Sequence, residues 1–214
     1  MATKTTLRVE VRSRRRARRA GMPALEAPFT SEFSPSPLPV RNRAEAEGLA
    51  HQIRALASSM GGVTLPALFA PTPLEPDMSL ALGLFPRALL PVLRDEAGAP
   101  LGEPRWGLWE AGRALVTLGR PPAQPDGEAR GAESLKEADL IVIPALAASA
   151  DGTRLGQGGG WYDRALMHRS PGVPIAAVIF DDEVLEAGII PAEAHDVPID
   201  VIITPTRTIT AHAR

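Results

Sequence analysis

Short apolar runs alternate with stretches of helical spacing in the C-terminal half of the chain. The runs at 139–144, 175–180 and 201–204 are rich in Ile and Val, and uninterrupted runs of this kind are typical of strands buried on both faces of a sheet. Residues 162–168 and 183–188, between these runs, have the pattern of helices. Strands that alternate with helices predict a three-layer α/β/α fold with a mostly parallel central sheet.

The N-terminal half predicts two long helices. Residues 4–19 place Leu7 and Val11 four positions apart, with basic residues on another face, which indicates a basic amphipathic helix. Residues 43–59 have helical spacing again and are followed by a Gly-Gly pair that is typical of a helix end. The other elements expected here are a helix at 79–86 and strands at 63–70 and 88–93, the second interrupted by Pro91.

Proline and glycine mark the stretches where no regular element is expected. Prolines recur through residues 22–40, where they exclude a continuous helix or a central strand and predict a loop. Residues 94–134 are rich in Gly and Pro and indicate no clear element, and the segment at 105–112, with its two tryptophans, has no evident role.

The composition is that of an ordinary globular protein. Hydrophobic residues make up 44% and charged residues 22% of the 214 residues, which predicts a single domain over 1–214. The chain has no cysteine, which excludes disulfides, Cys-ligated metal and a thiol nucleophile. No apolar run approaches the roughly 18 residues of a membrane span, and residues 1–25 lack the apolar core of a secretory signal. We therefore expect a cytoplasmic protein without a membrane partner.

Six arginines crowd residues 12–19 of the first predicted helix. On charge alone they favour a solvated face, a nucleic-acid-binding tail or a transit peptide. A nucleic-acid-binding protein is a competing hypothesis, but the formal net charge of −2 and the absence of a recognisable reading module count against it. The residues concerned are Arg12, Arg14, Arg15, Arg16, Arg18 and Arg19.

The densest chemical signal is the segment RLGQGGGWYDRAL, which spans residues 154–166. Its four glycines permit positive φ and close backbone approach, so that successive N–H groups can surround a phosphate, and the helix expected next adds its positive end. A tight turn is the structural alternative. The segment is neither a Walker loop nor a dinucleotide fingerprint, because the GK[ST] ending and the GxGxxG spacing are absent.

Three blocks, DLIVIPALA, DGTRLGQGGGWYDRAL and HDVPIDVIITP, resemble the 5-formyltetrahydrofolate cyclo-ligase family, also called methenyltetrahydrofolate synthetase, and occur in the order of that family. Lys4 and Arg8 look like its N-terminal basic pair, and FAPTPLE at 69–75 is similar to its pterin-contacting segment. The resemblance implies a monomeric enzyme that uses ATP and Mg²⁺ to convert 5-formyltetrahydrofolate to 5,10-methenyltetrahydrofolate, with release of ADP and phosphate. Catalysis would then consist chiefly of positioning and charge neutralisation.

The same resemblance implies roles for individual residues. ATP would be bound by Lys4, Arg8, Arg154, Leu155, Gly156, Gln157, Gly158, Gly159, Gly160, Trp161 and Tyr162. Folate would be bound by Ala70, Glu75, Gln157, Gly158, Gly159, Gly160 and Trp161. Magnesium would be held by Asp163 and Asp196, since carboxylate oxygens suit this ion.

Each acidic residue also has an ordinary alternative. Asp163 could be a helix-start residue, Asp196 a turn residue before Pro198, and Glu75 an exposed loop acid.

The chain departs from the family pattern at three positions. Trp161 replaces the first of two tyrosines, Ser149 stands where many members have aspartate, and Gln157 replaces a basic or aromatic residue. These changes keep open a second hypothesis, a related protein that binds folate or nucleotide without ligase activity. A charge for a polyglutamate tail could come from Arg12, Arg15 or Arg120.

Overall fold

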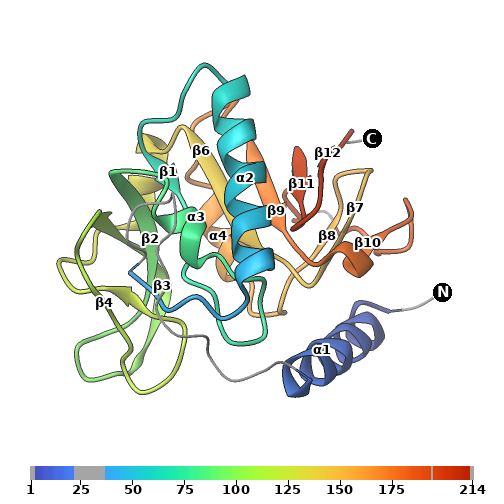
Figure 1. The fold of residues 1–214 in the computed structure, drawn as a ribbon, viewed down its shortest axis with the longest axis horizontal. Helices are drawn as coiled ribbons and strands as arrows, with labels where there is room; N and C mark the ends of the chain where they lie inside the picture. Colours follow the sequence, from blue (N-terminus) through green and yellow to red (C-terminus); the bar gives the residue numbers. More distant parts are fainter. Residues whose placement is uncertain (1–2, 22–36, 194, 213–214) are drawn as a thin grey trace.

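A seven-stranded sheet forms the centre of the computed structural model, which describes residues 3–21, 37–193 and 195–212 (Figure 1). The five inner strands are parallel, and one antiparallel strand closes each edge. In spatial order the strands are β12 (Thr208–Thr210), β11 (Val201–Ile203), β9 (Ile175–Val178), β6 (Leu140–Pro144), β1 (Pro66–Ala67), β2 (Arg87–Arg94) and β3 (Pro100–Glu110).

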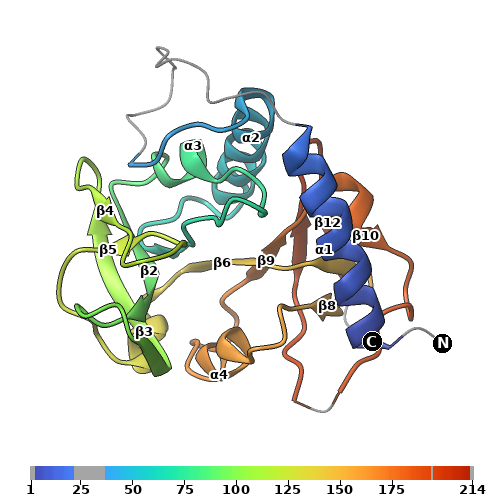
Figure 2. The same ribbon diagram turned by 90° about the horizontal axis from the view of Figure 1, so that it is seen from below.

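Helices cover both faces of the sheet, as Figure 2 shows. On one face α2 (Arg43–Ser59) and α3 (Ser79–Leu82) pack on a core that includes Val142 of β6. On the other face α4 (Trp161–Leu166) and the 3₁₀ turn η1 (Ala132–Glu137) pack on a core that includes Ile141. Adjacent residues of one strand thus enter two different cores, which is why this run is apolar without alternation. The predicted three-layer α/β/α fold is confirmed.

Helix α1 (Lys4–Ala20) lies outside these layers, against a small second sheet (Figure 2). That sheet contains β10 (Val184–Leu185), β7 (Ala147–Ser149) and β8 (Arg154–Leu155). Leu7 and Val11 of α1 pack on Leu146, Ala147, Leu155 and Ile190. Apolar burial alone therefore covers only one narrow stripe of the helix.

A buried ion pair supplies the second attachment of α1. The guanidinium of Arg15 donates to both carboxylate oxygens of Glu183, at 2.8 Å from Nε and 2.7 Å from NH2, and NH2 also donates to the carbonyl oxygen of Ala145 at 2.6 Å. The side chains of Arg15 and Glu183 are 1% and 0% exposed. The pair fixes the rotation of α1 about its axis, because only one face of the helix presents Arg15.

Several predicted elements differ from the observed ones. The helix expected at 183–188 is wrong: residues Asp181–Glu183 form a 3₁₀ turn, and Val184–Leu185 form β10, which pairs with β7. The helix expected at 79–86 is shortened to the single turn of α3. The strand expected at 63–70 keeps only two residues in the sheet ladder.

The Gly- and Pro-rich region at 94–134 contains elements that the sequence did not indicate. Strand β3 runs for 11 residues along β2, and β4 (Leu115–Val116) pairs with β5 (Gln124–Pro125). Of the loop expected at 22–40, residues 22–36 lie outside the described part of the chain, and residues 37–40 belong to no helix or strand. Among the described residues, every helix is too short or too polar to cross a bilayer.

Candidate active site

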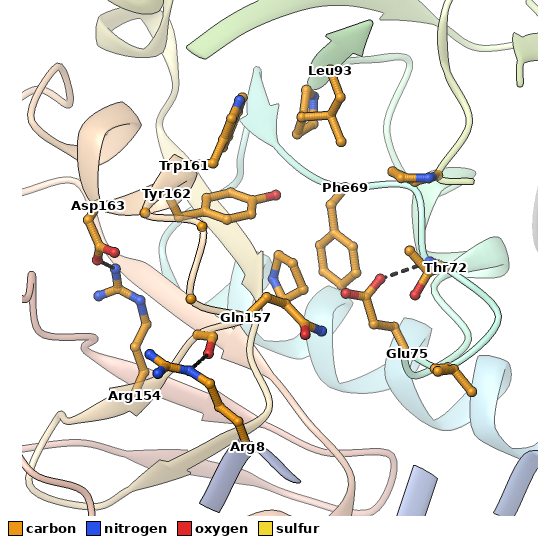
Figure 3. Close-up of a pocket in the computed structure, with 18 of the residues that line it drawn as sticks. Arg8, Phe69, Thr72, Glu75, Leu93, Arg154, Gln157, Trp161, Tyr162 and Asp163 are labelled. Atoms are coloured by element: carbon orange, nitrogen blue, oxygen red, sulfur yellow. Dashed lines mark hydrogen bonds and ion pairs between the residues drawn. The ribbon is translucent and has the colours of Figure 1, made fainter. Parts of the chain in front are cut away.

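The glycine-rich segment connects β8 to α4 at one wall of a cavity of about 880 Å³. Gly158 and Gly160 have φ of +95° and +64°, a left-handed conformation that strongly favours glycine. The sequence therefore needs glycine at these two positions to turn the chain from the strand into the helix. Figure 3 shows this segment facing the residues of the opposite wall.

Helix α1 brings two cations to the same cavity. Arg8 Nε donates to the carbonyl oxygen of Gly156 at 2.9 Å, and a Cβ on Gly158 would lie 3.4 Å from the Arg8 guanidinium. Lys4 Nζ donates to Asp196 at 2.7 Å and to Glu193 at 3.0 Å. Arg8 thus contacts the glycine-rich loop across 148 positions of the chain, and Lys4 lines the same cavity.

The loop is held by a second arginine of α1 that sequence reasoning did not assign to it. Arg12 NH2 donates to the backbone oxygen of Gln157 at 2.6 Å and to its side-chain oxygen at 3.0 Å. Arg12 lies one helical turn beyond Arg8. The sequence indicates this contact only indirectly: Arg12 is four positions after Arg8, so both side chains lie on the face of α1 that meets the loop.

The two aspartates expected to hold magnesium flank a buried arginine. Arg154 forms an ion pair with Asp163 and also donates to the carbonyl oxygen of Val197. Burial lowers the pKa of Arg154, and the charges of Asp163 and Asp196 act against this shift. Burial alone would raise the pKa of Asp196, but hydrogen bonds from Lys4 and from the backbone N–H of Glu193 lower it overall. The carboxylate of Asp196 is therefore held as an anion at the cavity.

A loop near the C-terminus gathers further metal-ligand atoms that the sequence did not single out. One candidate ligand atom from each of Glu193, His195 and Asp196 lies within 4.8 Å of the others. Asp163 is not a member of this group, but it lines the same cavity. The closeness of Glu193, His195 and Asp196 in the sequence could have indicated this group, but of the three only Asp196 was predicted to bind metal.

The opposite wall comes from the segment between β1 and α3 and from β2. Phe69, Ala70 and Glu75 line the cavity, and Glu75 is only 7% exposed. The carboxylate of Glu75 accepts a hydrogen bond of 2.8 Å from the backbone N–H of Thr72 and extends toward the same space as Tyr162 (Figure 3). Burial, followed by the charge of Glu75, raises the pKa of Tyr162, so its hydroxyl stays protonated. An acceptor and a donor therefore face the same space from two walls of the cavity.

Trp161 is fixed by another tryptophan. Its ring packs edge to face on Trp106 of β3, with ring centroids 5.3 Å apart and planes at 64°. It packs in a similar way on Tyr162, at 4.8 Å and 73°. Trp106 is 1% exposed. The segment at 105–112, which had no evident role, thus supports the aromatic wall from behind.

Known proteins resemble this chain over most of its length. The model of the 5-formyltetrahydrofolate cyclo-ligase family matches residues 51–205. A 5-formyltetrahydrofolate cyclo-ligase of Mycolicibacterium smegmatis is 40% identical over 172 residues, which cover 77% of this chain and 86% of that protein. The chain belongs to the 5-formyltetrahydrofolate cyclo-ligase family. A mitochondrial 5-formyltetrahydrofolate cyclo-ligase of Arabidopsis thaliana is 33% identical over 97 residues, 40% of this chain and 35% of that one.

Two solved structures share the fold. A 5,10-methenyltetrahydrofolate synthetase of Aquifex aeolicus superposes with a TM-score of 0.67 at 22% identity, covering 97% of this chain and 92% of that one. One of Mycoplasma pneumoniae gives a TM-score of 0.59 at 18% identity and covers 94% and 98% of the two chains. At such identities the likeness supports the architecture alone.

Most residues to which the cyclo-ligase family resemblance gave a role line one cavity. Leu155 is the exception: its side chain is fully buried in the cluster under α1, so only its backbone is available to a ligand. Ser149, one of the departures from the cyclo-ligase pattern, is also fully buried and bonds Asp151 and Thr153 away from the cavity. Gln157 and Trp161 are the two departures that face the site.

Proposed function

We propose that this chain catalyses the ATP-dependent closure of 5-formyltetrahydrofolate to 5,10-methenyltetrahydrofolate, with release of ADP and phosphate. The observation that carries the proposal is the meeting of three distant segments at one cavity: the basic pair of α1, the glycine-rich loop and the Glu75 wall. The cavity volume lies near the upper end of the roughly 300–1,000 Å³ that is typical of small-molecule sites. This size suits two substrates side by side.

The chemistry has two steps. The formyl oxygen on N5 attacks the γ-phosphorus of ATP, and the bond from that phosphorus to its bridging oxygen breaks as ADP leaves. N10 then attacks the formyl carbon and loses its proton, and the carbon–oxygen bond breaks as phosphate leaves and the five-membered ring closes. The first step turns a poor leaving group into a good one, and the second needs N10 held against the formyl carbon.

The residues at the glycine-rich loop would bind and orient the nucleotide. Lys4 and Arg8 supply positive charge, and the backbone N–H groups around Gly158 can point at phosphate oxygens. Arg12 would keep Gln157 in place while phosphate enters. Charge developing on the transferred phosphoryl group would thus meet donors that are already fixed.

Residues of both walls would orient the folate. The carboxylate of Glu75 can accept two hydrogen bonds from the amino and ring N–H groups of the pterin. The protonated hydroxyl of Tyr162 can donate to a substrate oxygen. Phe69 and Trp161 would exclude water from the reacting atoms.

The donor set at the cavity also fits magnesium. Asp163 and Asp196 offer hard carboxylate oxygens at the cavity wall, with Glu193 beside Asp196. Both aspartates are paired with cations that an arriving phosphate would attract, which frees carboxylate oxygens for the ion. Magnesium bound there would neutralise phosphate charge.

Contacts of the α1 arginines within the chain count against a nucleic-acid partner. Arg12 bonds Gln157, Arg15 pairs with Glu183, and Arg18 pairs with Asp182 at 2.6 Å. At least these three of the six arginines that suggested a nucleic-acid tail are thus engaged inside the protein. We propose a cytoplasmic monomer.

Mixing the protein with 5-formyltetrahydrofolate and Mg-ATP, and following the near-ultraviolet absorbance of methenyltetrahydrofolate, tests the activity. We expect product from the wild type, loss of more than about 100-fold in kcat/KM for Asp163→Ala because the phosphate charge is then poorly neutralised, and no change for the exposed control Asp126→Ala. Folate binding without product would instead favour a binding protein.

A further inference from the structure

The hairpin loop at 117–123, between β4 and β5, forms part of the cavity wall. Its base is closed by the pairing of Leu115 with Pro125 and of Val116 with Gln124. The side-chain oxygen of Gln124 accepts from the backbone N–H groups of Leu93 and Arg94, each at 3.1 Å, and its amide donates to the Arg94 oxygen at 2.9 Å. Gln124 is 4% exposed. The loop is thereby clamped to the end of β2.

The loop gives the cavity an apolar surface and a rigid backbone. Pro121, Pro122 and Ala123 line the cavity beside Pro91 and Leu93 of β2. The proline rings fix φ at both positions, and the Gln124 clamp holds the following residue. A planar aromatic group of a ligand could pack on this surface.

Arg120 stands at the exposed edge of this apolar surface and lines the cavity. The other arginines and the lysine of the lining are engaged: Lys4 with two carboxylates, Arg8 with Gly156, and Arg154 with Asp163. Within the described part of the chain, Arg120 is the basic residue of this lining that has no hydrogen bond or ion pair.

Two other arginines that could have served a charged tail are excluded by their contacts. Arg15 is buried against Glu183, and Arg12 donates three hydrogen bonds to Gln157. Neither can turn toward a ligand without breaking the attachment of α1 or of the glycine-rich loop. Of the three candidates, Arg120 alone is free to bind.

We propose that Arg120 binds the carboxylates of the glutamate portion of 5-formyltetrahydrofolate, an inference that rests on the proposed function and deepens it. Glu75 suits the pterin because that end of the molecule is rich in N–H donors. The aminobenzoyl ring would pack on Pro121, Pro122 and Leu93, and the glutamate carboxylates would reach the guanidinium, which can bind a carboxylate with two parallel hydrogen bonds. Since Arg120 is exposed, further glutamates would extend past it into solvent.

Titration calorimetry of the full chain with three ligands tests this assignment. The ligands are 5-formyltetrahydrofolate, its triglutamate, and 5-formyltetrahydropteroate, which lacks the glutamate. We expect Arg120→Ala to weaken both glutamate-bearing ligands about 10-fold, as one charge-assisted contact at an exposed site allows, and to leave the pteroate unchanged. Arg120→Lys should be intermediate. Arg113→Ala, an exposed arginine outside the cavity, is the matched control.

Three results would overturn the assignment: equal losses for the folate and the pteroate, no loss for either, or a loss confined to ATP. Binding is measured without turnover, so the inference and the proposed function fail in different ways. Folate binding that depends on Arg120, without any product, refutes the ligase and keeps the carboxylate contact. Product formation with unchanged folate binding in Arg120→Ala refutes the contact and keeps the ligase.

Discussion

Replacing Arg15 with methionine removes the only described cation that directly hydrogen-bonds the buried Glu183 carboxylate. Methionine keeps most of the side-chain volume, so the change tests charge rather than packing. In the variant, Glu183 retains the backbone N–H of Phe180 at 2.9 Å, and Arg18 NH1 lies 3.9 Å from its other oxygen. Those contacts cannot replace two hydrogen bonds and a full charge at contact distance.

The expected loss follows from burial. Removing one member of a buried ion pair typically costs about 3–5 kcal/mol, because the remaining charge is left desolvated. The residual contacts of Glu183 with Phe180 and Arg18 place Arg15→Met near the lower end, at about 3 kcal/mol. For a chain of 214 residues this corresponds to a fall in Tm of roughly 6–12 °C.

Urea and thermal unfolding of Arg15→Met, Glu183→Gln and the double variant measure this energy as a cycle. The double variant should recover much of the stability of the worse single variant, since neither charge is then left alone. Arg16→Met, on the exposed face of the same helix, removes the same charge and should change stability by less than about 0.5 kcal/mol. A loss below about 1 kcal/mol in Arg15→Met, or no recovery in the double variant, would refute the reasoning.

Two further stability predictions concern α2. Burial raises the pKa of Glu45 to about 7; the charge of Asp77 adds to this shift, and the backbone N–H of Asp77 and the charge of Arg41 oppose it. The folded state therefore holds this proton more tightly than the unfolded chain does. Stability should fall as pH rises from about 4.5 to about 7. Glu45→Gln keeps an acceptor for the Asp77 N–H and should abolish this fall. It should raise stability at about pH 8 by roughly 1–2 kcal/mol after allowance for partial exposure. Equal pH profiles of stability for the variant and the wild type would contradict this prediction. Gly48→Ala should destabilise by about 1–3 kcal/mol in urea unfolding, because the added Cβ meets the Pro205 carbonyl. Helix propensity alone predicts a gain of about 1 kcal/mol, so an observed gain would show that the Pro205 segment moves to make room for the Cβ. Gly127→Ala is the control, because it is the same substitution at a position with open space around it.

Sequence patterns predicted the parts of the fold that local periodicity encodes. The run at 139–144 indicated a strand buried on both faces, and the side chains of β6 do enter two separate cores. Leu7 and Val11 indicated the buried stripe of α1. The helix expected at 183–188 was wrong because Glu183, a good helix former, turns inward to Arg15, and Val184–Leu185 join β7. Long-range pairing of this kind leaves no local signature.

The candidate site was predictable to the extent that motifs carry it. The glycine-rich loop, the basic pair and Glu75 were visible as sequence, and they line one cavity. Arg12, Trp106, Glu193 and His195 were not, because their roles depend on which segments the fold brings together. Trp106 lies on the edge strand β3, 55 positions before Trp161 in the chain. Nothing in the sequence around either tryptophan indicates that their rings pack together.

The attachment of α1 also sets the order in which the protein can mature on the ribosome. Lys4 contacts Asp196 across 192 positions, and Arg15 contacts Glu183 across 168. The two carboxylates that pair with α1 are therefore synthesised long after the helix itself, and later than the loop at Gly156 and Gln157 that Arg8 and Arg12 bond. A nascent chain stalled before residue 183 would contain five of the seven strands of the central sheet but neither Glu183 nor Asp196, so α1 would lack both of these long-range carboxylate partners.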